Sequence, residues 1–379
     1  MKIILDVDAV RPPLTGIGRY VLELSRGLLR RDPRVSEVRF FSSGRWVDDP
    51  GQLLDGAGPV AMLRRRVPLH RFLRARYRQF REWRFATEVK HLSGFIYHAP
   101  NYLMMPFAGP SVVTVHDLSF LRHPEFHPRE RVDFLRRELP LSLARATHII
   151  TDSEFVRGEV SDLLKIDPAR ITSVSLGVDR SFRRFAMQEC VGTLARLGLR
   201  HKGYLLIVAT LEPRKNFRRL LQAFRSLPTA LRKEFPLAVV GDGGWLSADV
   251  QASIGQLEAD REAIRLGFVP QADLPIVYSG ATAFAFPSLY EGFGLPVLEA
   301  MAAGVAVVAS DNSSIPELAG SACLLVDPYS CESIASGLAT LLTDQPRRRT
   351  LEEYGLRRAS EFSWDRCTEQ TIGVYAQLH

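Results

Sequence analysis

Two glutamates eight positions apart, Glu291 and Glu299, have the spacing in this sequence that most directly suggests chemistry. Glu291 lies in a Gly/Pro-rich turn after an apolar run, and Glu299 lies inside the helical pattern that follows. A helix N-terminus offers unpaired N–H groups and a partial positive charge, and Gly292 and Gly294 let a ligand approach the backbone. This combination suits an anionic ligand that carries hydroxyl groups. The spacing alone also fits an ordinary strand–turn–helix with two solvated glutamates.

Two adjacent cations stand in a second turn of the same kind. Arg214 and Lys215 follow a short apolar run at 204–209 and precede a helical pattern. Such a pair can neutralise a diphosphate, because arginine adds bidentate donors and lysine adds a point charge. A solvated basic turn is the alternative interpretation.

One histidine, His116, follows directly on the predicted strand at 111–115. This is the edge at which ligands bind in open α/β sheets. Taken alone, the histidine fits a capping or buried structural role better. After the next predicted strand, at 147–151, the Asp-Ser-Glu sequence at 152–154 predicts the cap of a helix.

The N-terminal residues show a related arrangement. A predicted strand at 2–7 is followed by a stretch at 11–20, which we expect to be a flexible loop containing Gly16 and Gly18. Such a loop could cradle a phosphate, and a simple tight turn is the alternative. The next residue that would have to be glycine is Val21, so the stretch lacks the fingerprint of a nicotinamide-binding Rossmann fold.

Short apolar runs alternate with helical patterns along most of the chain, which indicates an α/β fold. The predicted strands lie at 2–7, 37–41, 94–98, 111–115, 147–151, 171–176, 204–209, 237–240, 264–268, 281–286 and 305–309. Periodicity is lost near 182–203, so we expect two Rossmann-like domains at 1–185 and 186–360, each with a parallel sheet between helices. Residues 361–379 should form a helix that packs back toward the first domain. We expect the site in a cleft where the strand ends of the two domains meet.

The composition is that of a globular protein. Of 379 residues, 46% are hydrophobic and 24% charged, and no apolar run is long enough for a transmembrane helix. The N-terminus reads as a buried strand rather than a signal peptide, and the four cysteines are scattered without a CxxC pair. We therefore expect a cytoplasmic protein with free thiols. No His, Cys or Asp cluster has zinc or iron spacing, so we expect no metal site and no cofactor.

The positive charge is concentrated in the first half. Residues 1–190 hold 31 Lys/Arg against 22 Asp/Glu, whereas the remainder holds 18 against 20. Residues 64–90 carry ten of these cations and two glutamates. The apolar side chains of this segment follow a helical stripe: Leu69, Phe72, Leu73, Tyr77, Phe80 and Trp83. This pattern favours a helix on the inner face of an anionic membrane, the alternative being a stripe that packs on the sheet. We expect no nucleic-acid partner, because no recognition motif accompanies the charge.

Five elements, taken in order, resemble a known family. They are Gly16-Ile17-Gly18, His116-Asp117, the Pro-Arg-Lys-Asn sequence at 213–216, the Gly-Phe-Val sequence at 267–269, and Glu291 through Glu299. Together they are similar to the retaining GT-B glycosyltransferases of family 4, over nearly the whole chain and most strongly from about 200 to 330. The most specific part is the glutamate pair, with its internal Gly-Phe-Gly-Leu-Pro and with Arg-Lys about 77 residues upstream.

The resemblance implies a role for each site residue. Arg214 and Lys215 would bind the diphosphate of a nucleotide-sugar donor, Glu299 its ribose, and Glu291 the transferred sugar. His116 would face that sugar near its 6-position. The other implied contacts are the loop at Gly16 and Gly18, Val269 near the base, and the backbone at Gly292, Phe293, Gly294 and Leu295 near the distal phosphate. With the charge neutralised in this way, transfer would need no metal.

The resemblance implies less about the substrates. The segments at 11–20 and 115–120 are similar to bacterial mannosyltransferases of lipopolysaccharide and exopolysaccharide assembly. We expect GDP-mannose as donor and a lipid-pyrophosphate-linked saccharide as acceptor, with transfer of rhamnose, glucose or N-acetylglucosamine as alternatives. A nucleotide-sugar-binding protein without catalysis and a sugar-nucleotide epimerase are the rival functions. The oligomeric state is not indicated.

Overall fold

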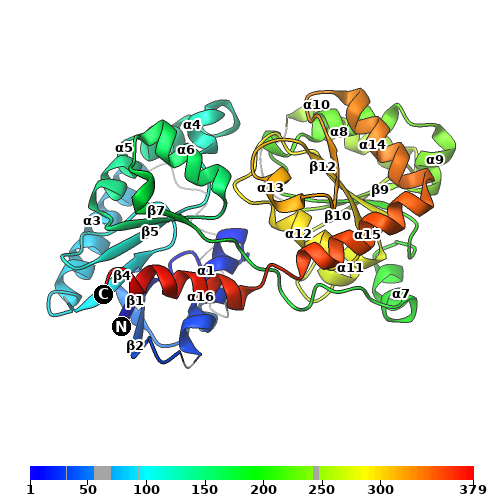
Figure 1. Ribbon diagram of the computed structural model, residues 1–379. Coiled ribbons are helices and arrows are strands. Elements are labelled where there is room, and N and C mark those ends of the chain that lie inside the picture. Colours follow the sequence, from blue (N-terminus) through cyan, green and yellow to red (C-terminus); the bar gives the residue numbers. More distant parts are fainter. Residues whose placement is uncertain (31, 55–69, 93, 242–246) are drawn as a thin grey trace. The chain divides into compact units, whose positions relative to one another are not determined.

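The computed structural model describes residues 1–30, 32–54, 70–92, 94–241 and 247–379, and only the backbone for 70–78. The chain forms two compact units. Unit 1 comprises residues 1–177 together with 364–379, and unit 2 comprises residues 178–363. Each unit is a β-sheet flanked by helices (Figure 1).

Unit 1 is built on a seven-stranded sheet in the order β3-β2-β1-β4-β5-β6-β7. Its strands are β1 (Lys2–Asp6), β2 (Glu37–Ser42), β3 (Arg45–Val47), β4 (Phe95–Ala99), β5 (Ser111–Val115), β6 (His148–Thr151) and β7 (Ile171–Ser173). Its helices are α1 (Gly16–Leu29), α3 (His70–Glu88), α4 (Ser119–Arg122), α5 (Arg129–Arg145), α6 (Glu154–Leu164) and α16 (Trp364–Ala376). Short 3₁₀ turns lie at Pro50–Leu54, Pro124–Phe126 and Pro168–Arg170.

Unit 2 has a six-stranded sheet in the order β10-β9-β8-β11-β12-β13, and its neighbouring strands are parallel. The strands are β8 (Leu205–Val208), β9 (Leu237–Val240), β10 (Ala263–Gly267), β11 (Ala283–Phe286), β12 (Ala306–Ser310) and β13 (Leu324–Val326). The helices are α7 (Met187–Arg196), α8 (Phe217–Arg225), α9 (Thr229–Glu234), α10 (Ala248–Ala259), α11 (Leu274–Gly280), α12 (Leu295–Ala302), α13 (Ile315–Ala319), α14 (Cys331–Thr343) and α15 (Gln345–Ala359). A 3₁₀ turn, η4, spans Pro213–Lys215.

The predicted strands are all present, with ends within three residues of those expected. The edge strands β3 and β13 were not predicted, because three residues are too few to show an alternating pattern. β3 pairs antiparallel with β2, so this edge departs from the predicted parallel sheet, whereas the other neighbouring strands of unit 1 are parallel as predicted. The reversal between them uses Ser43 and Gly44, whose φ values of 52° and 86° suit a tight hairpin turn.

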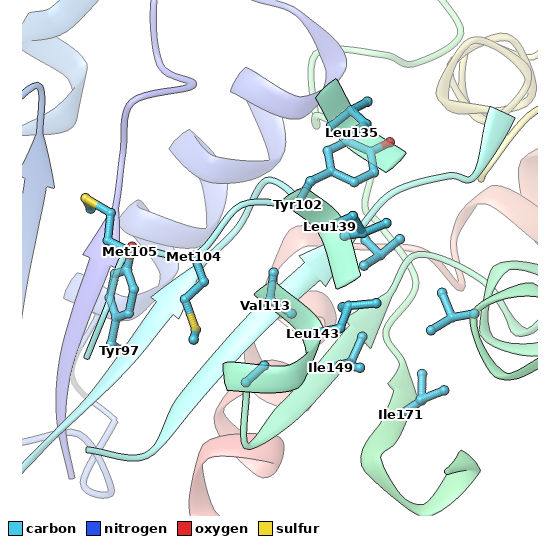
Figure 2. Close-up of a cluster of buried hydrophobic side chains, with 14 of the residues drawn as sticks. Tyr97, Tyr102, Met104, Met105, Val113, Leu135, Leu139, Leu143, Ile149 and Ile171 are labelled. Carbon is cyan, nitrogen blue, oxygen red and sulfur yellow. The ribbon is translucent and has the colours of Figure 1, made fainter. Parts of the chain in front are cut away.

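A buried hydrophobic cluster packs α3 and α5 onto the sheet of unit 1 (Figure 2). Tyr97, Val113 and Ile149 project from three neighbouring strands, and Leu139 and Phe85 meet them from the helices. Each of these side chains is at most 1% exposed. Since burying one such side chain is worth about 1.5–3 kcal/mol, the cluster fixes the strands whose ends carry the candidate residues of this unit.

The division between the units lies at 177/178 rather than at the expected 185/186. The intervening residues contact unit 2: Phe185 donates its N–H to Ser279 Oγ at 2.8 Å, and Arg184 pairs with Glu353 at 2.9 Å. The C-terminal helix α16 belongs to unit 1, where it packs against α1.

Helix α1 begins at Gly16, so the expectation of a flexible loop over residues 16–20 was wrong. Thr15 is the N-cap, and its hydroxyl accepts a hydrogen bond from Gly18 N at 3.2 Å. Gly18 also packs closely, because a Cβ there would lie 2.7 Å from the carbonyl oxygen of Ala9. Close packing therefore accounts for a glycine at position 18, in the first turn of a helix.

The basic segment at 64–90 forms α3 from His70 onward, while residues 64–69, with Leu69, lie outside the described residues, as do the side chains of Phe72, Leu73 and Tyr77. Among the described side chains of this helix, Phe85 is fully buried. Phe80 and Trp83 of the predicted stripe are instead 51% and 61% exposed, so this part of the stripe does not pack on the sheet. None of the described helices is both long and apolar enough to span a membrane.

Candidate functional site

The strand order of unit 2 brings the two main candidate sequences together. β8 and β11 are neighbours in a parallel sheet, so their carboxyl ends lie at the same edge. Arg214 and Lys215 lie in η4, after β8, and Glu291 lies in the turn after β11. The two turns are joined directly, because Leu289 N donates to the carbonyl oxygen of Arg214 at 2.8 Å.

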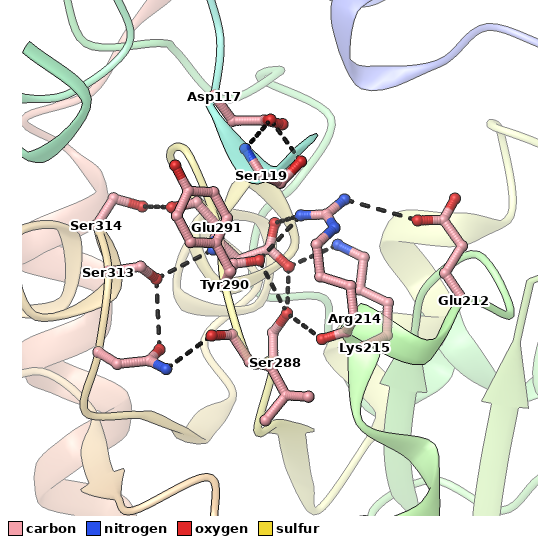
Figure 3. A network of polar contacts seen from close by, with 12 residues as sticks. Asp117, Ser119, Glu212, Arg214, Lys215, Ser288, Tyr290, Glu291, Ser313 and Ser314 are labelled. Carbon is pink, nitrogen blue, oxygen red and sulfur yellow. Dashed lines mark hydrogen bonds and ion pairs between the residues drawn. The ribbon is translucent and has the colours of Figure 1, made fainter. Parts of the chain in front are cut away.

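Glu291 contacts both cations (Figure 3). Arg214 Nη1 donates to its Oε2 at 2.9 Å, and Lys215 Nζ donates to its Oε1 at 2.6 Å. Glu212 lies 3.8 Å from Arg214, so two carboxylates balance two cations in this cluster. Lys215 Nζ also lies 4.9 Å from the ring centroid of Phe286.

These charges are largely shielded from water. The side chains of Glu291 and Lys215 are 8% and 9% exposed. Burial would raise the pKa of Glu291, but the charges of Arg214 and Lys215 outweigh it, so the pKa lies below its usual value and the carboxylate is ionised. Burial, together with the charge of Arg214, lowers the pKa of Lys215 despite the opposing effect of Glu291. The cluster is thus a buried site without net charge, and a further anion would upset the balance between its two cations and two carboxylates.

Three serines, which the sequence analysis did not single out, hold Glu291 in place. Ser288 Oγ donates to its carboxylate at 2.5 Å, and Ser313 Oγ accepts from its backbone N–H at 3.0 Å. Ser314 Oγ donates to its backbone carbonyl at 3.0 Å. Ser313 and Ser314 lie in the loop after β12, which neighbours β11. That strand adjacency was the missing signal, because the sequence shows the loop only as a polar stretch.

The start of α12 carries backbone amides that make no hydrogen bond within the described residues. Gly294 has a φ of 105°, and a Cβ there would lie 2.6 Å from Ile315 Cδ1, so only glycine fits. Within the described residues, the N–H groups of Phe293, Gly294 and Leu295 donate to no protein acceptor. N–H groups of this kind at a helix N-terminus can bind an anion, which is the role that the resemblance implies for them.

The other predicted residues of unit 2 lie around the same sheet edge. Glu299 is in the second turn of α12, half-buried, and accepts a hydrogen bond from Tyr278 OH at 3.0 Å. Val269 follows β10 and is buried, whereas its neighbour Phe268 is 68% exposed. Of the predicted residues of this unit, the structure brings Arg214, Lys215 and Glu291 into direct contact.

In unit 1, His116 is 6% exposed at the end of β5. Its Nδ1 lies 2.8 Å from Asp152 Oδ2, and its Nε2 lies 2.8 Å from the carbonyl oxygen of Pro100. Burial would lower the pKa of His116, but Asp152, with smaller contributions from the Pro100 carbonyl and Asp117, raises the pKa above its usual value. Both ring nitrogens therefore have hydrogen-bond partners within unit 1. The Asp-Ser-Glu sequence at 152–154 does cap α6, as predicted: Ser153 is the N-cap and accepts from Val156 N.

Helix α1 lies beside this histidine. The ring of Tyr20 meets the His116 ring edge-on at 5.3 Å, and Tyr102 meets it edge-on at 5.8 Å. Gly16 and Gly18 lie in the first turn of the same helix as Tyr20.

Two further carboxylates, not singled out from the sequence, stand at the end of β1. Asp8 contacts Arg81 of α3, whose guanidinium lies 3.8 Å from Asp6. Burial raises the pKa of Asp6 to about 7, with a further contribution from Asp8 and an opposing one from Arg81. The sequence Asp6-Val7-Asp8 thus holds a cation from its own chain.

Two family models match the chain. The model described as "Glycosyl transferases group 1" matches residues 196–358, and the model described as "Glycosyltransferase Family 4" matches residues 14–182. The O-antigen chain mannosyltransferase B of Escherichia coli is 37% identical over 387 residues, covering 100% of both chains. The D-inositol 3-phosphate glycosyltransferase of Salinispora arenicola (strain CNS-205) is 30% identical, over 71% of this chain and 63% of that protein.

Solved structures share the whole fold. Sucrose-phosphate synthase from Thermosynechococcus elongatus superposes with a TM-score of 0.73 at 20% identity, covering 100% of this chain and 99% of the other. WaaG, a glycosyltransferase involved in lipopolysaccharide biosynthesis, gives 0.72 at 16% identity, covering 98% and 99%. At these identities the likeness shows the fold, which is GT-B, as the sequence predicts.

Proposed function

Because this chain belongs to the family 4 glycosyltransferases, with the GT-B fold, we propose that it transfers mannose from GDP-mannose to a growing saccharide of a bacterial surface polysaccharide. The full-length identity of 37% to an O-antigen mannosyltransferase carries this proposal. The acceptor we propose is a saccharide linked to a lipid pyrophosphate. The excess of positive charge in the first half of the chain supports an anionic acceptor there.

Arg214 and Lys215 would bind the diphosphate of the donor. When the sugar leaves, negative charge grows on the distal phosphate and positive charge on the anomeric carbon. The two cations and the amides of Phe293, Gly294 and Leu295 can stabilise the first of these charges in a buried setting, where such interactions are strong. We propose that these groups suffice and that transfer needs no metal. Equal rates with and without a chelator would support this.

The remaining residues would orient the sugar and the nucleoside. We assign hydroxyls of the transferred sugar to Glu291, those of the ribose to Glu299 and the base to the vicinity of Val269. His116 would contact the sugar near its 6-position, and Gly16 and Gly18 would contact phosphate or acceptor. Transfer with retained anomeric configuration is part of the same proposal.

A thermal-shift screen followed by a turnover assay tests the proposal. We expect GDP and GDP-mannose to raise the melting temperature more than the UDP, dTDP or ADP counterparts do. Incubation with GDP-mannose and a lipid-linked acceptor should then release GDP. Stabilisation by a different base would point to rhamnose, glucose or N-acetylglucosamine as the sugar. Binding without acceptor-dependent GDP release would indicate a non-catalytic nucleotide-sugar-binding protein.

We also propose that α3 rests on an anionic membrane surface. Phe80 and Trp83 support this, because both are exposed and their ring centroids lie 6.1 Å apart. The cation Arg84 of the same helix adds less to this proposal, because it is paired with Glu88 at 3.1 Å. Replacing both aromatics by serine should reduce binding to vesicles of anionic phospholipid, whereas serine at the exposed Tyr354 should not. Equal binding of the two variants would contradict the proposal.

A further inference from the structure

The imidazole of His116 is held by two bonds of different kinds. At Nε2 its partner is the carbonyl oxygen of Pro100, which can only accept, so Nε2 carries a proton. At Nδ1 its partner is a carboxylate oxygen of Asp152. With Tyr20 and Tyr102 against its sides, the ring has a fixed orientation and a fixed proton on Nε2.

The surroundings of Asp152 suggest that its carboxylate contributes little to the free energy of unfolding. It is 3% exposed, and its Oδ1 has no hydrogen-bond partner within the described residues. Burial raises its pKa, and the charge of His116 offsets this only in part. The adjacent helix is capped by Ser153, so the carboxylate is not needed there. A buried carboxylate with a single partner costs stability, which makes a functional reason for it the better explanation.

We infer that Asp152 is a positioning residue for His116. Its hydrogen bond to Nδ1 keeps the ring in the orientation in which Nε2–H points at the Pro100 carbonyl. In the complex, a hydroxyl of the bound substrate takes the place of that carbonyl as the acceptor. This inference rests on the proposed function, since it takes His116 as a substrate contact. If the wild-type chain transfers no sugar, the proposed function fails. If the wild-type chain transfers sugar and the variants described below do not behave as stated, the inference about Asp152 fails.

The test compares Asp152→Ala, Asp152→Asn, His116→Ala and the double variant Asp152→Ala/His116→Ala. We expect Asp152→Ala to lower kcat about 100-fold, the size of effect that a misplaced group produces, with the KM for GDP-mannose unchanged. Its melting temperature should stay within about 4 °C of wild type. Asp152→Asn should keep kcat within about fivefold, because an amide can donate to Nδ1 while Nε2 keeps its proton. The double variant should be no slower than His116→Ala alone.

A matched control separates positioning from folding. Glu159 is another buried carboxylate of unit 1 and pairs with Arg122 at 2.8 Å. Glu159→Ala should lower the melting temperature and leave kcat unchanged at a temperature where it is folded. Wild-type kcat for Asp152→Ala would overturn the inference, as would its failure to fold. A double variant clearly slower than His116→Ala, or a loss that Asn does not rescue, would overturn it as well.

Discussion

Replacing Glu291 by Gln should tighten the binding of a nucleoside diphosphate and slow transfer at the same time. The substitution keeps the shape of the side chain and removes its charge. In the wild type that charge lies 2.9 Å from Arg214 and 2.6 Å from Lys215, the cations to which we assign the diphosphate. An arriving diphosphate therefore meets cations that a carboxylate already neutralises.

The magnitude follows from Coulomb's law. Glu212, Arg214, Lys215 and Glu291 sum to zero when ionised, and the substitution leaves one positive charge. At about 5 Å and an effective dielectric constant of about 20, a unit charge contributes about 3 kcal/mol. The cost of removing water from the diphosphate offsets part of this. We therefore expect GDP to bind about tenfold more tightly, equal to about 1.4 kcal/mol. The free enzyme should lose about 3 kcal/mol of stability, because two buried cations lose a partner.

Calorimetry of GDP binding and melting temperatures with and without GDP measure both effects. We expect the variant to melt lower than wild type without ligand and to gain more from GDP. Transfer should fall at least 100-fold, because the assigned sugar contact is weakened. Glu212→Gln is the matched control: it also removes a charge near Arg214, so it should tighten GDP binding with a smaller loss of transfer. GDP affinity for Glu291→Gln at or below the wild-type level, or near wild-type turnover, would refute the reasoning.

Three further outcomes are expected. Lys215→Ala should weaken GDP binding about tenfold or more through loss of a buried charge, and unchanged affinity in calorimetry would contradict this. The folded pKa of Asp6, about 7, exceeds the unfolded value near 4, so the wild type loses stability as the pH rises between them. Asp6→Asn should therefore raise the free energy of unfolding at pH 8 more than at pH 4. Asp162→Asn, at an exposed position, is the control. An equal effect of Asp6→Asn at pH 8 and at pH 4 would argue against this prediction. Gly241→Ala should lower the melting temperature by many degrees, since its Cβ would lie 1.9 Å from the Ala209 carbonyl oxygen at a φ of 136°. Gly255→Ala in α10, which meets nothing within 4 Å, should not lower it.

The sequence was most informative where a strand runs directly into a candidate turn. Arg214, Lys215 and Glu291 could be placed because each follows an apolar run that had to be a buried strand. Their contact with one another depends on β8 and β11 being neighbours, although β9 and β10 lie between them in the sequence. Local patterns hold no information on that order, so only the resemblance to a family joined the two turns in advance.

The sequence was least informative where two residues could perform the same local task. Asp152 and Ser153 are both good helix caps, and their order does not decide between them. The pairing of β5 with β6 decides it, because it places residue 152 next to His116. The start of α1 was missed for a similar reason: two glycines argue against a helix, and the packing of Gly18 against Ala9 overrides that preference.

In the proposed function, the Glu291 carboxylate pairs with two cations before the donor binds and with sugar hydroxyls afterwards. The serines around Glu291 would hold it in place for both. Ser288 holds its side chain, and Ser313 and Ser314 hold its backbone, so Glu291 is fixed from both sides. If Arg214 and Lys215 bind the donor diphosphate as we propose, their side chains would be the groups that turn toward it, because the serines hold Glu291. That movement would leave the Glu291 carboxylate in place with acceptor positions for the hydroxyls of a bound sugar.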